Sequence, residues 1–292
     1  MLKHRAMLTL TFAPVDEAPS LPDETAPGVQ VWREHDGTVA AYGGTLDAHR
    51  HWMKLPGLAS YLFEAGRCVI VAHPHESGNE GLVQDAFTRS VLPMALQALG
   101  REVLHASGVL GPRGVVGLCA VSETGKSTLA YGLSRRGHPV WADDAVALDI
   151  ESEPVAALPL PFALRLRPSS ATFFDVERLP ADARSVSERS ELRGSAPLAT
   201  LCVLERVERV GTEHGIEIER LEAADAFTAL LTHAYCFTLD DTERKRHMLE
   251  AYLDLVKRVP VLRVRLEAGL EQLPAMLDEL ERATLSSEVE AA

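Results

Sequence analysis

Apolar runs in the first hundred positions predict a small antiparallel sheet followed by a helix. The strand candidates share alternating or continuous apolar residues next to turn-forming ones, and they are 1–14, 29–34, 38–44 and 68–74. A helix is expected over 80–99, and Pro93 should kink or break it because proline has no N–H to donate. The pattern therefore predicts an N-terminal α+β portion over residues 1–100.

The pattern changes after residue 100 to strands and helices in alternation, which is typical of an α/β domain. Residues 114–121 form a continuous apolar run, as expected for a strand covered on both faces of a parallel sheet. A helix should follow over 126–137 and end at Gly137, a favourable C-terminal cap. Further strands are expected in 138–150, 198–207, 216–222 and 259–267, and further helices in 223–235, 241–258 and 270–283. We expect this domain to cover 101–285, with a frayed tail at 286–292.

The composition argues against several classes of function. The 292 residues carry a net charge of −13, which argues against binding a nucleic-acid backbone. No stretch reaches the ~18 apolar residues of a membrane span. The four cysteines lie far apart with no CxxC pair, which favours reduced thiols in a cytoplasmic protein over a disulfide framework or a zinc site.

The strand over 114–121 leads into a candidate phosphate loop. The loop consists of Ala120, Val121, Ser122, Glu123, Thr124, Gly125, Lys126, Ser127 and Thr128. It fits the Gly-rich phosphate-binding pattern with Ala in the first Gly position, and it lies between a buried strand and a helix as that pattern requires. Such a loop points main-chain N–H groups and the positive end of a helix at a phosphate. The alternative is a connection that contains Gly-Lys-Ser by chance.

The polar side chains of this loop have separate expected roles. Lys126 would neutralise the β and γ phosphates of ATP, and the Ser127 hydroxyl would bind Mg²⁺. Glu123 is unusual because a carboxylate repels phosphates, so we expect its side chain to point to solvent. ATP and Mg²⁺ are therefore the expected cofactors, with GTP left open.

Two acids and a histidine complete the candidate site. Asp143 and Asp144 end the strand expected after the loop helix, and His105 precedes the loop in "VLHASGVL". One aspartate could orient an acceptor hydroxyl and the other could hold Mg²⁺, since neighbouring residues of a strand point to opposite sides. The alternatives are a capping Asp-Asp pair and a hydrogen-bonded structural histidine.

The order of His105, Lys126 and the paired aspartates in "RRGHPVWADD" resembles the catalytic domain of HPr kinase/phosphorylase. That resemblance implies a phosphate-loop kinase core of the HPr kinase/phosphoenolpyruvate carboxykinase type and phosphorylation of a serine. It also implies Asp144 as the base and Asp143 on the metal side. The segment "PLPFALRLRPSSATFF" replaces the family's Arg-Gly motif and metal-binding Glu. With the "LHAS" histidine, it is more similar to the HPr-kinase-like proteins of peptide-modification clusters, such as lasso-peptide kinases.

Arg165 and Arg167 alternate in "LRLRP", so they should face the same side of a strand. They could contact phosphates or an acidic peptide, or they could be a solvated face.

These features together predict an ATP-dependent kinase that phosphorylates a hydroxyl of a peptide, protein or small molecule. One alternative is a nucleotide-binding regulator or ATPase of the same fold. Another is a catalytically impaired scaffold that binds a peptide, which Glu123 and the missing Glu motif favour. The oligomeric state stays open.

Overall fold

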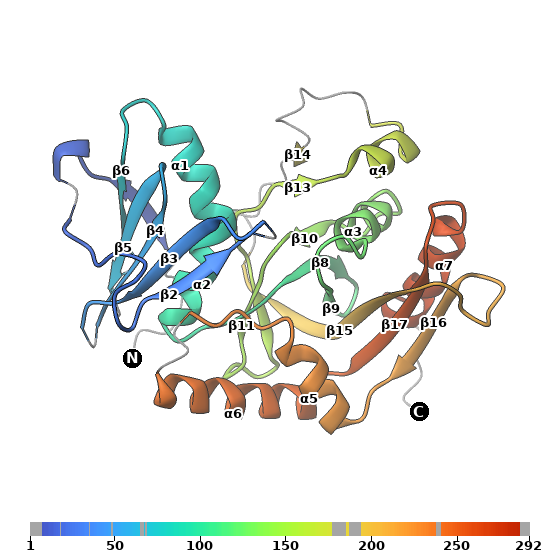
Figure 1. The fold of residues 1–292 in the computed structure, drawn as a ribbon. Helices are drawn as coiled ribbons and strands as arrows, with labels where there is room; N and C mark the ends of the chain where they lie inside the picture. The colour runs from blue at the N-terminus through green and yellow to red at the C-terminus, as the bar shows by residue number, and fades with distance from the viewer. Residues whose placement is uncertain are drawn as a thin grey trace. The chain divides into compact units, whose positions relative to one another are not determined.

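The computed structural model describes residues 8–286 except 18, 35, 48, 65–66, 68, 177–184, 187–193 and 238–240 (Figure 1). The chain forms two compact units, of which the first is Met1–Arg101 with Tyr235–Met248 and the second is Glu102–Ala234 with Leu249–Ala292. The first unit thus combines the N-terminal part of the chain with a later segment of fourteen residues.

The first unit is a six-stranded sheet with helices. Its strands are β1 (Thr9–Phe12), β2 (Gln30–Arg33), β3 (Val39–Thr45), β4 (Arg50–Leu55), β5 (Ala59–Glu64) and β6 (Val69–Pro74). They lie in the order β1-β6-β5-β4-β3-β2, and only β1 and β6 pair in parallel. The sequence pattern missed β4 and β5, although the Pro-Gly turn between them, with φ +73° at Gly57, is a hairpin signal.

The helix expected over 80–99 is present but irregular. α1 (Glu80–Ala86) passes through a π-helical turn at Phe87–Val91 into α2 (Leu92–Ala98). Pro93 lies directly after the π-helical turn and has no N–H to donate to the turn before it. The hydrogen-bond pattern therefore changes next to Pro93, but the helix continues through it.

The second unit is built on a mixed nine-stranded sheet. Its strands are β7 (Glu102–Leu104), β8 (Ala106–Gly111), β9 (Gly114–Cys119), β10 (Val140–Ala142), β11 (Val146–Asp149), β12 (Ala156–Leu158), β15 (Ala196–Val207), β16 (Ile216–Arg220) and β17 (Val261–Glu267). The order is β10-β8-β9-β15-β12-β11-β7, and β17 pairs with β15 and β16. Every residue of β9 is buried, as expected. Its neighbours differ from the expectation, because β15 is parallel to it and β8 is antiparallel.

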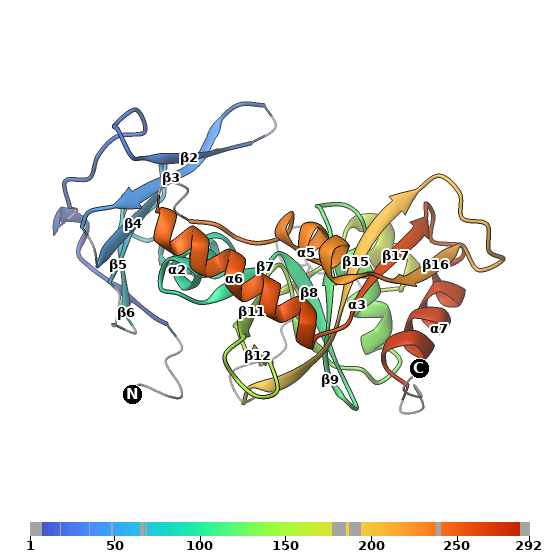
Figure 2. The ribbon, with the colours of Figure 1, turned by 90° about the horizontal axis from the view of Figure 1, so that it is seen from below.

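Two helices cover one face of this sheet around β9. α3 (Lys126–Ser134) and α7 (Leu273–Thr284) share one apolar core with β9, β15 and β17 (Figures 1 and 2). The helices approach closely at Gly132, where a Cβ atom would lie 2.7 Å from the Leu277 side chain. Gly137 adopts φ +97° after α3 and closes that helix as the sequence predicted.

The remaining elements of the second unit are short or partly shared. They are a two-stranded ribbon of β13 (Leu164–Arg165) and β14 (Ser185–Val186), the helices α4 (Pro168–Phe173) and α5 (Ala223–Leu231), and α6 (Thr242–Arg258), which crosses the unit boundary. None of the described helices has the length and apolar character needed to cross a membrane.

Candidate active site

The candidate phosphate loop joins β9 to α3 and forms one wall of a cavity of about 550 Å³ in the second unit. Two of its residues have positive φ, +74° at Glu123 and +118° at Gly125. Gly125 is the N-cap of α3, so the loop curls directly in front of the helix N-terminus. Main-chain N–H groups and the positive end of a helix dipole there attract anions. This agrees with the loop conformation expected from the sequence.

Lys126 is held at the base of the loop. Its side chain is only 6% exposed. The Nζ atom lies 2.9 Å from the Ala120 carbonyl oxygen and 3.0 Å from Nε2 of His105. Burial lowers the pKa of Lys126, whereas Asp144 and Asp143 act to raise it. The nearby carboxylates therefore favour the charged form that a phosphate needs.

His105 is oriented from both of its ring nitrogens. Nδ1 lies 3.0 Å from the main-chain oxygen of Asp144. Because a carbonyl oxygen can only accept, Nδ1 carries the proton and Nε2 accepts from Lys126. Burial, and then the charge of Lys126, lower the pKa of His105, so the neutral ring is the stable form. His105 therefore contacts both the loop lysine and the main chain of Asp144.

A second histidine lies behind this contact. The main-chain N–H of His105 donates to the His233 carbonyl at 2.7 Å. Burial, with His105 and Lys126 nearby, lowers the pKa of His233 to about 4. Nothing in the spacing of "THAY" marks His233, because only the fold brings the end of α5 beside residue 105.

Asp143 is buried against two serines. Its carboxylate accepts hydrogen bonds from Ser107 Oγ at 2.5 Å and from Ser127 Oγ at 3.0 and 3.2 Å. Burial, with Asp144 nearby, raises the pKa of Asp143 to about 6. The sequence analysis missed Ser107, which follows His105 by two residues in β8.

The Ser127 hydroxyl and the Asp143 carboxylate fit Mg²⁺, which prefers oxygen ligands and near-octahedral geometry completed by water and phosphate. Among the described residues no group of three or more His, Cys, Asp or Glu side chains could hold a metal ion by itself.

Asp144 takes a different direction from its neighbour. β10 ends at Ala142, so the expectation that both aspartates lie on the strand is wrong, and they occupy the turn that follows it. Asp144 has φ +64°, a left-handed conformation that aspartate tolerates better than most residues. Asp144 lines the cavity, whereas Asp143 faces Ser107 and Ser127. The two aspartates therefore have different surroundings.

Arg165 and Arg167 both line the cavity, and both are exposed while Leu166 between them is buried. The expected alternation is therefore present. The strand β13 ends at Arg165, however, and Arg167 is the N-cap of α4. Glu123 is 67% exposed, as expected, and its carboxylate forms an ion pair with Arg167 at 2.5 Å.

The far wall of the cavity was not predicted from the sequence. It has four large apolar side chains, two charged side chains and a glycine, and these residues are Arg206, Leu266, Glu267, Gly269, Leu270, Leu273 and Met276. Leu270, Leu273 and Met276 lie in α7 or just before it, and Arg206, Leu266 and Glu267 lie at the ends of β15 and β17.

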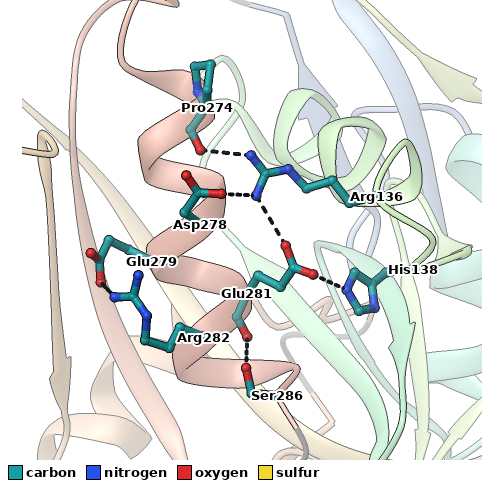
Figure 3. Close-up of polar contacts among 8 residues, drawn as sticks. All are labelled: Arg136, His138, Pro274, Asp278, Glu279, Glu281, Arg282 and Ser286. Carbon is teal, nitrogen blue, oxygen red and sulfur yellow. Dashed lines mark hydrogen bonds and ion pairs between the residues drawn. The ribbon is translucent and has the colours of Figure 1, made fainter.

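Polar contacts fasten α7 to the end of α3 (Figure 3). Arg136 donates to Asp278 at 2.6 Å, to Glu281 at 3.2 Å and to the Pro274 carbonyl at 2.9 Å. His138 Nε2 lies 2.8 Å from the other Glu281 oxygen. The hydrogen bond from His138, with Arg136 nearby, lowers the pKa of Glu281. The phosphate-loop helix and the apolar wall are thereby joined.

Comparisons with known proteins find distant similarity to solved structures. No protein family model matches the chain, and no curated protein matches it. Among solved structures, the Hpr(Ser) kinase/phosphatase from Coxiella burnetii is similar with a TM-score of 0.34 and 13% sequence identity, over 62% of this chain and 96% of that chain. This similarity is too distant to assign a function, and the residues around the loop are the basis for one.

Proposed function

We propose that the second unit is an ATP-dependent kinase that transfers the γ-phosphoryl group to a hydroxyl of a peptide, protein or small molecule. The observation that carries the proposal is that Lys126 and Asp144 line the same cavity, which puts a phosphate-neutralising cation and a carboxylate on it. Between them, the His105 ring contacts the Lys126 ammonium and the main-chain oxygen of Asp144. The order of these residues along the chain also supports an HPr-kinase-like phosphotransferase.

The strand order supports a division of the cavity into two halves. β9 carries the loop, and β10, with the aspartates at its end, lies two strands away on one side. β17, which ends in the apolar wall, lies two strands away on the other side. A nucleoside base suits the apolar half and a polar acceptor suits the half with Asp144 and the arginines. The phosphates would lie between them on the loop.

The transfer breaks one bond and forms one. The acceptor oxygen forms a bond to the γ-phosphorus while the bond from that phosphorus to the β,γ-bridging oxygen breaks, and its electron pair leaves with ADP. Asp144 accepts the acceptor's proton. Because phosphoryl transfer depends mainly on position and charge, these residues need only orient the hydroxyl and neutralise the phosphates. Ser127 and Asp143 would hold Mg²⁺, which supplies further neutralisation of the phosphate oxygens.

Asp144→Asn tests this mechanism. The amide keeps the size of the side chain and removes the basic oxygen, so transfer should fall by roughly 10²–10⁴-fold. Binding of MgATP should stay within a few-fold of the wild type, because Asp144 would contact the acceptor. The measurement is transfer of ³²P from γ-labelled ATP to serine-containing peptides and small hydroxyl compounds, with nucleotide affinity determined alongside. Full transfer by Asp144→Asn would overturn the assignment.

The same experiment separates the alternative functions. Release of labelled inorganic phosphate with no labelled acceptor would favour an ATPase or nucleotide-binding regulator. Nucleotide binding without any turnover would favour a scaffold that binds a peptide, for which Glu123 in the loop is the best support.

A further inference from the structure

An ion pair spans the mouth of the candidate phosphate loop. Glu123 lies between the ends of the loop, and its Oε1 is 2.5 Å from Nη2 of Arg167. The two side chains are 67% and 63% exposed. An ion pair this exposed contributes little to stability. Its effect is to hold a guanidinium at the opening of the cavity, beside the loop.

The segment that carries Arg167 is tied to the loop machinery on both sides. Before it, the main-chain N–H of Arg165 lies 3.4 Å from Oδ2 of Asp143. After it, Ser170 Oγ lies 2.9 Å from Oγ1 of Thr128 in the first turn of α3. The residues on either side of Arg167 therefore connect its segment to Asp143 and to α3.

Burial decides which way the arginine points. Leu164 and Leu166 are both part of the apolar core of the second unit. In this extended stretch neighbouring side chains alternate, so the side chain of Arg167 must face the cavity. The side of the segment on which Arg167 lies therefore follows from packing, and the ion pair with Glu123 sets where its guanidinium rests.

The charges of Glu123 and Arg167 indicate how this ion pair would affect phosphate binding. A carboxylate in the middle of a phosphate loop opposes phosphate binding, and the guanidinium of Arg167 cancels its charge. Phosphates carry more negative charge than one carboxylate and, like a carboxylate, accept two parallel hydrogen bonds from a guanidinium, so they compete with Glu123 for Arg167. Arg167 lines the same cavity as the loop residues that would hold these phosphates.

We propose that Arg167 is a catalytic residue that moves from Glu123 onto the transferring phosphoryl group, and that Glu123 holds it at the cavity mouth until nucleotide binds. The inference rests on the proposed kinase function and adds to it a cation beyond Lys126. It accounts for the acidic residue in the loop, which otherwise opposes the ligand. Arg167 then has two separable effects, one on Glu123 before transfer and one on the phosphoryl group during transfer.

A double-variant experiment separates these effects without knowledge of the acceptor. Aluminium fluoride with MgADP imitates the planar phosphoryl group in transfer, so we would measure the Kd of MgADP with and without it. The proteins are the wild type, Arg167→Ala, Glu123→Ala, the double variant and a matched control, Arg135→Ala. Arg135 is exposed at the end of α3 and does not line the cavity. Circular dichroism confirms that each variant is folded.

In the wild type and in Arg135→Ala, fluoride should tighten MgADP binding on the order of 10²-fold. Arg167→Ala should bind MgADP more weakly, because Glu123 is left uncompensated. The double variant should regain the wild-type affinity for MgADP alone but should still lack the tightening by fluoride.

If aluminium fluoride still tightens MgADP binding in the double variant, the proposed role of Arg167 is wrong and the kinase proposal is unaffected. Wild-type protein that binds MgADP but shows no tightening would contradict both proposals. The two failures are therefore distinguishable.

Discussion

Asp143 is a buried carboxylate whose ionised form the folded protein disfavours. Its pKa rises from 3.8 to about 6, mainly because burial removes it from water. The protonated carboxyl is therefore the form that folding favours. Its contribution to stability is complete below pH 3.8 and is lost as the pH rises through about 6. A charged Asp143, which Mg²⁺ binding would need, therefore lowers the stability of the folded protein at neutral pH.

Asp143→Asn should therefore stabilise the ligand-free protein at neutral pH. At pH 7.5 we expect a gain of about 1–3 kcal/mol in the free energy of unfolding, since one pKa unit corresponds to about 1.4 kcal/mol. The gain should vanish below pH ~4, where the carboxyl is protonated in both folded and unfolded chains. Denaturation at both pH values measures the difference. A variant that is less stable than the wild type at pH 7.5 would show that the carboxylate stabilises the fold.

The same variant should need more Mg²⁺ for nucleotide binding, because a neutral amide is a poorer ligand for a hard cation. In the wild type the apparent Mg²⁺ affinity should fall as the pH drops through about 6, where Asp143 gains a proton. Titration of nucleotide binding with Mg²⁺ at pH 5 and 7.5 measures both effects. Equal Mg²⁺ dependence in wild type and variant would remove Asp143 from the metal site.

At the residue scale, the sequence names the members of the site that belong to a local pattern. Lys126 and Ser127 follow from the loop motif, and the paired aspartates follow from the strand after it. Ser107 and His233 could not be named, because a serine in a strand and a lone histidine after a helix have no characteristic spacing. Ser107 contacts Asp143 and His233 contacts the main chain of His105, and both contacts arise only when the sheet has formed.

The element that most affects the apolar half of the cavity is α7. It packs on α3 where Gly132 leaves room for Leu277. It is also fastened at its side by Arg136, whose side chain is only 26% exposed and contacts two carboxylates and a carbonyl (Figure 3). The position of the cavity wall therefore depends on a residue at the far end of the phosphate-loop helix.

Arg136→Ala should loosen α7 and weaken nucleotide binding. We expect the Kd of MgATP to rise several-fold, with a loss of about 1–2 kcal/mol in stability from a network of partly buried charged hydrogen bonds. Arg282→Ala is the matched control, because Arg282 lies on α7, is 65% exposed and pairs with Glu279 in the same helix. Calorimetric titration and thermal unfolding measure both quantities. Equal effects of the two variants would show that the contact with α3 does not position the wall.

The elements themselves were predictable to different degrees. β9 and α3 carry strong signals, a continuous apolar run and a glycine-closed helix, and both are present. β4 and β5 were missed because their alternation is short, and the Pro-Gly turn between them was not used. The strand around Arg165 is only two residues long because Pro168 opens a helix directly after Arg167.

At the scale of the whole molecule, the sheet order could not be read from the sequence. β9 lies between β8, its neighbour in sequence, and β15, which follows it by more than seventy residues. Pairing between such distant strands depends on tertiary packing, which local periodicity does not report. That order is what separates the aspartates from the apolar wall, and so it decides which half of the cavity suits which ligand.

We propose that this cavity binds the phosphates of a nucleotide at Lys126. Titration of the protein with MgATP tests this binding directly and needs no acceptor. The wild type should bind, and Lys126→Ala should bind about 10²-fold more weakly, since a charge-assisted hydrogen bond contributes roughly 1.5–3 kcal/mol. Lys257→Ala, which removes an exposed lysine of α6 outside the cavity, should bind like the wild type. Wild-type protein that does not bind MgATP, or a folded Lys126→Ala protein with unchanged affinity, would contradict the account.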